Sequence, residues 1–248
     1  MKENKIIELK DISIFRGKKQ ILHHVNWSTY QGQHWFILGN NGSGKTTLLE
    51  ILMGYLWPQE GSVFILGQQY GKICIPDLRK KIGYVSTWIF NRMYKRYNVE
   101  DIVASGIDGS TSYLSEKNTD IVEQVHKMAD AFSCVHLLEK SFGSISSGEQ
   151  FKVILCRALI NQPELLILDE PFAFLDIGAR QKAYRLIEQI AIKPSAPQIV
   201  LVTHHLEDIR SFYTQGMIIK DGKIFQNGSK ESILEPDNLN KVFDISDF

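Results

Sequence analysis

Gly39-Asn40-Asn41-Gly42-Ser43-Gly44-Lys45-Thr46-Thr47 is the stretch around which the rest of this chain is arranged. It follows the apolar run Trp35-Phe36-Ile37-Leu38 and precedes the largely apolar stretch 48–53, in which only Glu50 is charged. This order predicts a strand, a glycine loop and a helix. The spacing Gly-x-x-x-x-Gly-Lys-Thr is that of a phosphate-binding loop. Glycines let backbone N–H groups turn toward phosphates, and the amino end of the following helix favours an anion. We expect Lys45 to reach the β- and γ-phosphates and the Thr46 hydroxyl to hold Mg²⁺.

The alternative interpretation of this stretch is a glycine turn followed by a surface lysine. At ordinary residue frequencies, roughly one chain of this length in a hundred would match the four fixed positions by accident. The strand before the loop and the helix after it make an accident less frequent still. We therefore predict that the loop binds a nucleoside triphosphate, while the use made of that nucleotide must be inferred from the rest of the chain.

The composition bounds the class of protein. The chain has 248 residues, of which 44% are hydrophobic and 23% are charged, as expected for one globular domain or a domain with a small inserted lobe. Lys plus Arg and Asp plus Glu both number 28, so the chain lacks the basic field of a dedicated nucleic-acid binder. No apolar run approaches the roughly 20 residues that cross a bilayer, and the amino terminus lacks a signal-peptide core. We expect a cytoplasmic protein.

Three cysteines occur, Cys74, Cys134 and Cys156, with no close pair in the sequence. An odd number without close spacing argues for a reducing compartment and against a zinc site or a disulfide framework. We expect all three to be buried structural thiols.

The pattern along the chain predicts an α/β fold. Apolar alternation at 6–15 and 21–29 indicates antiparallel strands beside the glycine loop. From about 88 to 160 the pattern is helical, with caps expected at Asn98 and at Asn118 or Thr119, which indicates a small inserted helical lobe. Strands at 165–168 and 198–202 alternate with helices at 147–160 and 177–192, as in a buried parallel sheet. Asp221-Gly222 predicts a type I′ hairpin turn.

A second chemical motif follows the apolar strand at 165–168, which ends in Asp169-Glu170-Pro171. A carboxylate at the tip of a buried strand beside a phosphate loop can hold Mg²⁺, and Asp169 has that position. Glu170 can polarise the water that attacks the γ-phosphate. Taken alone, the same residues could be solvated acids that end a strand, but the phosphate loop in the same chain favours the catalytic interpretation.

Ser146-Ser147-Gly148-Glu149, preceded by Ile145, resembles the signature sequence of the ATP-binding cassette (ABC) ATPases, whose usual form is Leu-Ser-Gly-Gly-Gln. It lies between the phosphate loop and the acidic strand, as in that family. The other elements match in the same order: Phe15 fits the aromatic residue that stacks on adenine, 174–176 fit the loop after the acidic strand, and Thr203-His204 fit the switch histidine. The resemblance covers essentially the whole chain.

This resemblance implies a phosphate-loop NTPase core with a mixed, largely parallel sheet, an antiparallel β subdomain and an inserted α-helical subdomain. It also implies ATP and Mg²⁺ as ligands and a head-to-tail dimer with two nucleotides at the interface. Ser146, Ser147, Gly148 and Glu149 would then contact the nucleotide held by the second copy, and Asp176 would communicate across the joint. His204 would sense the γ-phosphate.

The roles assigned to the signature residues and to His204 each have a simpler, structural alternative. Ser146 and Glu149 also form a Ser-x-x-Glu capping box, which is compatible with anion binding because a capped helix amino terminus attracts anions. A histidine is more often structural than catalytic, and only its position directly after Thr203 favours a role for His204. His205 and the pair His23-His24 receive no role.

The sequence departs from the family pattern at three positions. Thr87 stands where the family normally has a glutamine that contacts Mg²⁺ and water, so we expect any contact of Thr87 with the metal to run through a water. Ser147 and Glu149 replace the usual Gly and Gln, which bears on the contact made across the dimer. The segment 88–97 mixes aromatic and basic residues, and it could bind single-stranded nucleic acid, dock a membrane subunit, or cover the core of the lobe.

The leading prediction is the ATPase subunit of an ABC transporter, attached peripherally to the inner face of the cell membrane and coupled to transmembrane permease subunits on separate chains. Residues 105–106 and 110–113 loosely resemble a branch associated with molybdenum uptake. The alternative is a soluble ABC ATPase that acts on nucleic acid or ribosomes. A single cassette and the lack of a sustained heptad pattern in the lobe argue against that alternative.

Overall fold

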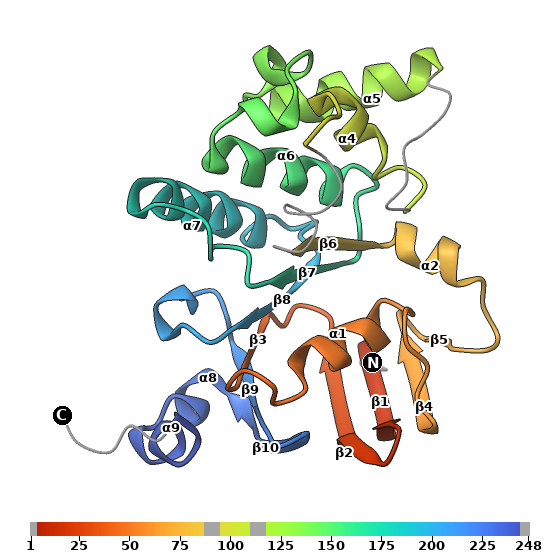
Figure 1. Ribbon diagram of the computed structural model, residues 1–248, viewed down its shortest axis with the longest axis vertical. Helices are drawn as coiled ribbons and strands as arrows, with labels where there is room; N and C mark the ends of the chain where they lie inside the picture. The colour runs from red at the N-terminus through yellow and green to blue at the C-terminus, as the bar shows by residue number, and fades with distance from the viewer. Residues whose placement is uncertain (1–3, 87–94, 110–117, 244–248) are drawn as a thin grey trace. The chain divides into compact units, whose positions relative to one another are not determined.

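The computed structural model describes residues 4–86, 95–109 and 118–243 (Figure 1). The chain divides into two compact units. The first comprises Met1–Ile75 and Gln198–Phe248, and the second comprises Pro76–Pro197.

The first unit contains an antiparallel sheet in the order β2-β1-β4-β5. Its strands are β1 (Lys5–Arg16), β2 (Lys19–Tyr30), β4 (Glu60–Ile65) and β5 (Gln68–Gln69). Ile7, Leu9 and Ile14 are almost fully buried on β1, as the apolar alternation of this strand requires. The antiparallel layer predicted near the amino terminus is therefore present.

A second set of strands in the same unit carries the glycine loop. β3 (Trp35–Leu38) is buried along its whole length and pairs in parallel with β8 (Gln198–Thr203) on one side and β9 (Gln215–Lys220) on the other. β10 (Lys223–Ser229) pairs antiparallel with β9. Both turn residues between them have positive φ, 49° at Asp221 and 73° at Gly222, which agrees with the predicted type I′ turn.

The helices of the first unit are α1, α8 and α9. Their bounds are α1 (Lys45–Leu52), α8 (Lys230–Ile233) and α9 (Pro236–Phe243), with a 3₁₀ turn η3 (Leu206–Asp208). α8 begins directly after β10, and Ser229 caps it through its side chain. α9 was not predicted, because the tail offered no cap that distinguished it from a loop.

The second unit combines two parallel strands with the helical segments. β6 (Ile82–Ser86) pairs in parallel with β7 (Leu165–Asp169). The helices are α2 (Ile75–Lys80), α4 (Val99–Ala104), α5 (Thr119–Ala131), α6 (Ser147–Leu159) and α7 (Ile177–Ala191), with 3₁₀ turns η1 (Val135–Leu137) and η2 (Phe142–Ser144). α4 ends close to α6, since a Cβ at Gly106 would lie 2.2 Å from the carbonyl oxygen of Arg157. The buried Arg157 Nε also donates to Ser105 Oγ at 3.0 Å.

The two expected helix caps in this unit turn out differently. Asn118 Oδ1 accepts a hydrogen bond from Ile121 N at 3.0 Å, so its predicted cap is present. Asn98 occupies the cap position of α4, but its side chain makes no capping bond. The first N–H groups of α4 instead donate to backbone carbonyls, Val99 N to Lys140 O and Glu100 N to Leu138 O, each at 3.0 Å. A side-chain cap is then redundant.

The three cysteines differ in their exposure to solvent. Cys134 and Cys156 are fully buried, as predicted, while Cys74 is exposed and the prediction for it was wrong. The packing brings Cys134 Sγ within 3.8 Å of Cys156 Sγ, although the two residues are far apart in sequence. The hydrogen bond with Cys134, followed by burial, raises the pKa of the Cys156 thiol well above its usual value.

Among the described residues, no helix is both long and apolar enough to cross a membrane.

Candidate nucleotide-binding site

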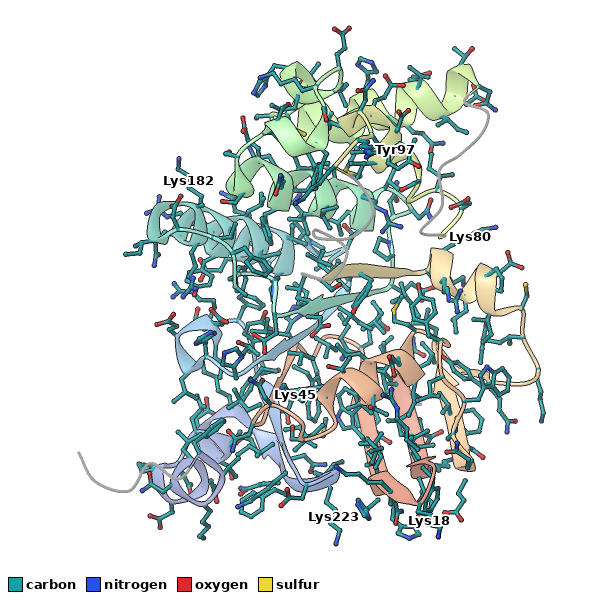
Figure 2. All side chains as sticks on the ribbon, viewed as in Figure 1. Lys18, Lys45, Lys80, Tyr97, Lys182 and Lys223 are labelled. Atoms are coloured by element: carbon teal, nitrogen blue, oxygen red, sulfur yellow. The ribbon has the colours of Figure 1, made fainter. Side chains whose placement is uncertain are left out.

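The glycine loop joins β3 to α1, and Lys45 is the first residue of that helix (Figure 2). Gly44 precedes it in the left-handed conformation, with φ of 109°. Only 8% of Lys45 is exposed, and its Nζ donates to Gly39 O at 2.6 Å and to Asn40 O at 3.1 Å. A buried ammonium is thereby held inside the loop, at the amino end of a helix that also favours an anion.

The glycines of the loop serve packing as well as phosphate access. A Cβ at Gly39 would lie 2.4 Å from the carbonyl oxygen of Ile219 on β9, and one at Gly44 would lie 2.8 Å from Leu22 Cδ2 on β2. Ser43 N donates to Asn40 O at 3.1 Å, and Gly222 N donates to Ser43 O at 2.9 Å. Neighbouring strands therefore fix the loop from both sides.

Two observations fit this loop to a phosphate ligand and a hard cation. Ser43 is 5% exposed, and its Oγ is buried without a hydrogen-bond partner among the described residues, an arrangement that costs free energy unless a ligand supplies one. Thr46 is exposed in the first turn of α1, so its hydroxyl is accessible to a metal. A hydroxyl oxygen such as that of Thr46 is among the oxygen ligands that Mg²⁺ accepts.

Phe15 lies near the end of β1, with 36% of its surface exposed. Its backbone N–H donates to Gln59 Oε1 at 3.1 Å, and the adjacent Arg16 Nη2 lies 3.1 Å from Glu50 Oε2 on α1. This pair ties the end of β1 to the helix that follows the loop. An exposed aromatic ring on this strand end is therefore available for stacking on a planar base.

The acidic motif stands at the end of β7 in the second unit. Tyr84 Oη donates to Asp169 Oδ2 at 3.1 Å, a contact that orients the carboxylate. Glu170 follows with φ of 48°, in the left-handed region that non-glycine residues rarely adopt. A backbone conformation of this kind costs about 1–3 kcal/mol and persists only where the surrounding structure holds it.

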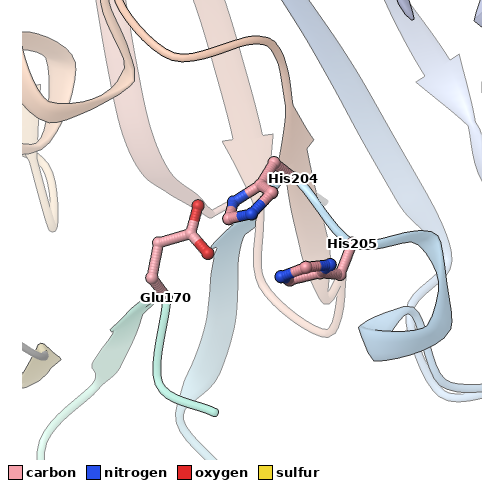
Figure 3. A group of neighbouring side chains, drawn as sticks. All are labelled: Glu170, His204 and His205. Atoms are coloured by element: carbon pink, nitrogen blue, oxygen red, sulfur yellow. The ribbon is translucent and has the colours of Figure 1, made fainter. Parts of the chain in front are cut away.

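The histidine turn follows β8 in the first unit. The Thr203 hydroxyl donates to Asp208 Oδ2 at 2.6 Å and accepts from His205 N at 3.0 Å, and both Thr203 and Asp208 are buried. These bonds fix the turn and leave His204 exposed. Figure 3 shows the rings of His204 and His205, whose centroids are 3.9 Å apart.

The signature stretch begins α6 with a complete capping box. Glu149 N donates to Ser146 Oγ at 3.4 Å, and Ser146 N donates to Glu149 Oε2 at 2.8 Å. α7 begins similarly, because Asp176 Oδ1 accepts from Ala179 N at 2.8 Å. The two helix starts are close, since a Cβ at Gly148 would lie 3.2 Å from Ala179 Cβ. A cavity of about 630 Å³ is lined in part by Ser146, Gly148 and Asp176.

Comparison with known proteins identifies the family of this chain. The model of the ABC transporter family matches residues 22–173, more than half of the chain. The chain belongs to the ABC transporter family.

Relatives and solved structures extend the match over nearly the full length. A putative ABC transporter ATP-binding protein of Streptococcus mutans is 35% identical over 239 residues, covering 96% of this chain and 92% of that protein. The uncharacterized ABC transporter ATP-binding protein YmeB of Lactococcus lactis is 33% identical over 229 residues, covering 92% and 88%. The ADP conformation of MJ1267, an ATP-binding cassette of an ABC transporter, has the same fold, with a TM-score of 0.82 at 21% identity, covering 98% of this chain and 99% of that one.

The predicted fold and activity are thereby confirmed. The chain is an ABC ATPase that binds ATP and powers transport together with membrane permease subunits. The alternative of an ABC ATPase acting on nucleic acid receives no support from these relatives.

Two residues of this ABC ATPase that bond to parts of the candidate site, Tyr84 and Asp208, could not be identified from the sequence. Both act through side chains brought together by the fold, Tyr84 on the strand beside Asp169 and Asp208 after the turn that carries His204. An acid just beyond a buried strand was the only available signal for Asp208. Thr87, the segment 88–94 and residues 110–113 lie outside the described residues.

The capping box of the ABC signature gives a prediction for stability. Hydrogen bonds from the Ser146 hydroxyl and then from its backbone N–H lower the pKa of Glu149 below the ordinary 4.5. A lowered folded-state pKa stabilises the protein above the unfolded value, and this contribution is lost as the pH falls through the folded value. We therefore expect Glu149→Gln to lower the free energy of unfolding at neutral pH, with a deficit that shrinks as the pH falls below about 4.5. Ser146→Ala should cost about 1 kcal/mol at pH 7.

Urea unfolding of the nucleotide-free chain between pH 7 and pH 3 measures both effects. Glu123→Gln, an exposed change on α5, is the matched control and should stay within about 0.5 kcal/mol of wild type. A Glu149→Gln deficit that is constant across this pH range would contradict the capping role of the carboxylate.

Proposed function

We propose that this ABC ATPase works as a head-to-tail homodimer in which the glycine loop of one copy and the signature stretch of the other enclose each Mg²⁺-ATP. The buried Ser43 hydroxyl, which has no hydrogen-bond partner among the described residues, carries the nucleotide half of this proposal, because a phosphate oxygen would accept its hydrogen bond. The buried Lys45 ammonium in the same loop supplies positive charge for such an anion. Backbone N–H groups of Gly39–Thr47 would cradle the phosphates, and Phe15 would stack on the adenine.

In this proposal each remaining residue has one task. Thr46 and Asp169 would hold Mg²⁺, and the ion would supply positive charge to the phosphates. Tyr84 orients the Asp169 carboxylate. Glu170 would accept a proton from the attacking water, and its strained backbone supports a fixed direction for that carboxylate. His204, held by the Thr203–Asp208 turn, would donate a hydrogen bond to the γ-phosphate.

Exposed apolar residues support the dimer. Phe174 is 59% exposed and Ile177 is 84% exposed, on either side of the cap residue Asp176 at the start of α7. Large apolar side chains at such exposure gain free energy when a partner covers them. They adjoin the helix start that packs near Gly148, so a second copy seated there would also meet the signature. Ser146, Ser147, Gly148, Glu149 and Asp176 would face its nucleotide.

We also propose the bounds of the helical subdomain and the cellular location of the dimer. Residues 88–160 would form the inserted helical subdomain that meets the permease, and the dimer would sit on the inner face of the cell membrane. Family membership and the transporter relatives support both statements.

A mixing experiment tests the dimer. Lys45→Ala removes the ammonium from the loop, and Ser147→Asp sets a carboxylate at the first turn of α6, where it favours the helix but repels phosphate. Each variant alone should hydrolyse ATP poorly. In a mixed head-to-tail dimer, one site collects both defects and the other collects none, so activity should return. Random mixing gives half heterodimers with one intact site of two, or about a quarter of wild-type turnover.

Phosphate release from equal mixtures of the two variants distinguishes sites shared between two copies from sites that lie within one chain. Recovery toward a quarter of wild-type activity supports sites shared between copies. If each site lay within one chain, the mixture would stay as inactive as its components, and the dimer proposal would be wrong. Circular dichroism and thermal unfolding of each variant check that both remain folded.

A further inference from the structure

The carboxyl end of α9 contacts the glycine loop. Asn40 Nδ2 donates to the backbone carbonyl of Val242 at 2.8 Å, joining residues 202 positions apart. Lys220 Nζ, at the end of β9, donates to the neighbouring carbonyl of Lys241 at 2.7 Å. α9, β9 and α1 all belong to the first unit, and α9 is the last helix among the described residues (Figure 1).

These two bonds satisfy groups that a helix cannot satisfy itself. The last four carbonyls of an α-helix have no intrahelical partner, and Lys241 and Val242 lie in the final turn of α9. The Lys220 ammonium also suits the negative end of the helix dipole. A helix of 8 residues is marginal on its own, so α9 depends on such outside contacts and on the buried Val242 side chain.

Asn40 serves the loop at the same time. Its backbone carbonyl accepts from Ser43 N and from Lys45 Nζ, each at 3.1 Å, so this residue shapes the first turn of the loop. Its side chain is bonded to α9, which leaves only its backbone for the proposed phosphate cradle. The conformation of Asn40 therefore depends on contacts with both the phosphate loop and α9.

We propose that α9 is a positioning element for the glycine loop, and that Asn40 couples docking of α9 to nucleotide binding. The inference rests on the proposed ATP site at the loop. Docked α9 holds Asn40 in the binding conformation, so the loop pays less ordering entropy when the nucleotide binds. Because coupling is reciprocal, bound nucleotide must also stabilise the docked helix by the same factor.

Two full-length variants test the coupling from opposite sides. Asn40→Leu removes the amide donor without adding charge, and Lys220→Met removes the ammonium from a position outside the loop. Titration with a fluorescent 2′/3′-methylanthraniloyl ATP should show each variant binding about 5–20-fold more weakly than wild type. If both act through α9, the double variant should lose less than the product of the two effects. Asn4→Leu, whose amide donates to Gln31 on the same unit, is the matched control and should bind normally.

Hydrogen exchange of the α9 amides reads the reciprocal effect. Saturating ATP should slow their exchange in the wild type, and much less so in Asn40→Leu. Normal binding by Lys220→Met alongside weak binding by Asn40→Leu would overturn the proposal, as would α9 exchange that ignores ATP. If the wild type itself fails to bind the ATP analogue, the nucleotide site fails instead, so the two failures are distinguishable. Thermal unfolding of each variant checks the fold.

Discussion

Glu170→Gln should bind ATP with wild-type affinity while hydrolysing it about 10²–10⁴-fold more slowly. The amide keeps the size of the carboxylate and leaves the residue at the same left-handed backbone position, so the loop and the metal ligands are undisturbed. It cannot accept the proton of the attacking water. Because ATP then persists at the interface, the variant should accumulate as a closed dimer.

Phosphate release measures turnover, equilibrium titration measures ATP affinity, and light scattering measures the dimer. Glu164→Gln is the matched control: Glu164 is an exposed acid paired with Lys81 at 3.3 Å, and such a pair is worth about 0–1 kcal/mol. Its turnover should equal that of the wild type. A Glu170→Gln variant that hydrolyses ATP at the normal rate would remove Glu170 from the reaction. A variant that remains monomeric with saturating ATP and Mg²⁺ would instead count against the dimer.

Lys45→Ala should weaken ATP binding by about 100-fold or more, which corresponds to about 2.7 kcal/mol or more. The buried ammonium is replaced by a methyl group, so the β- and γ-phosphates lose a charge-assisted donor in a site of low polarity. The two bonds from Lys45 Nζ to Gly39 O and Asn40 O are lost as well, which loosens the empty loop.

The matched control is Lys223→Ala, an exposed lysine on β10 that keeps the change in net charge the same (Figure 2). It should bind ATP normally in an equilibrium titration with Mg²⁺ present. Thermal unfolding without nucleotide separates a binding defect from a folding defect. Wild-type affinity in a folded Lys45→Ala variant would exclude the loop lysine from the nucleotide site.

The features that could be predicted from sequence are those governed by local rules. The strand–loop–helix unit at Trp35–Leu38 and Lys45–Leu52 follows from an apolar run, glycines at fixed spacing and an apolar helix face. The Asp221-Gly222 turn and the Ser146/Glu149 capping box depend on residues at most three positions apart. In each case the interacting groups lie close along the chain, so spacing alone identifies them.

The features that escaped prediction depend on distant residues. Asn98 fits a helix cap by its position, but the first N–H groups of α4 donate to the backbone carbonyls of residues 138 and 140 instead. Cys134 and Cys156 looked unrelated until the packing brought their sulfur atoms together. The bond from Tyr84 to Asp169 required the register of β6 against β7, and nothing near either residue indicates it.

The glycine loop illustrates the division. By itself, the sequence determined that the chain carries a phosphate-binding loop, an acidic strand end and a signature motif in the order of an ABC ATPase, because these motifs are short and their chemistry dictates their spacing. Only the tertiary structure decided what holds that loop, namely the hydrogen bond from Gly222 N to Ser43 O and the bond from the Asn40 side chain to the carboxyl end of α9. Contacts across about 180–200 positions depend on how buried strands and helices pack, and no local pattern encodes them.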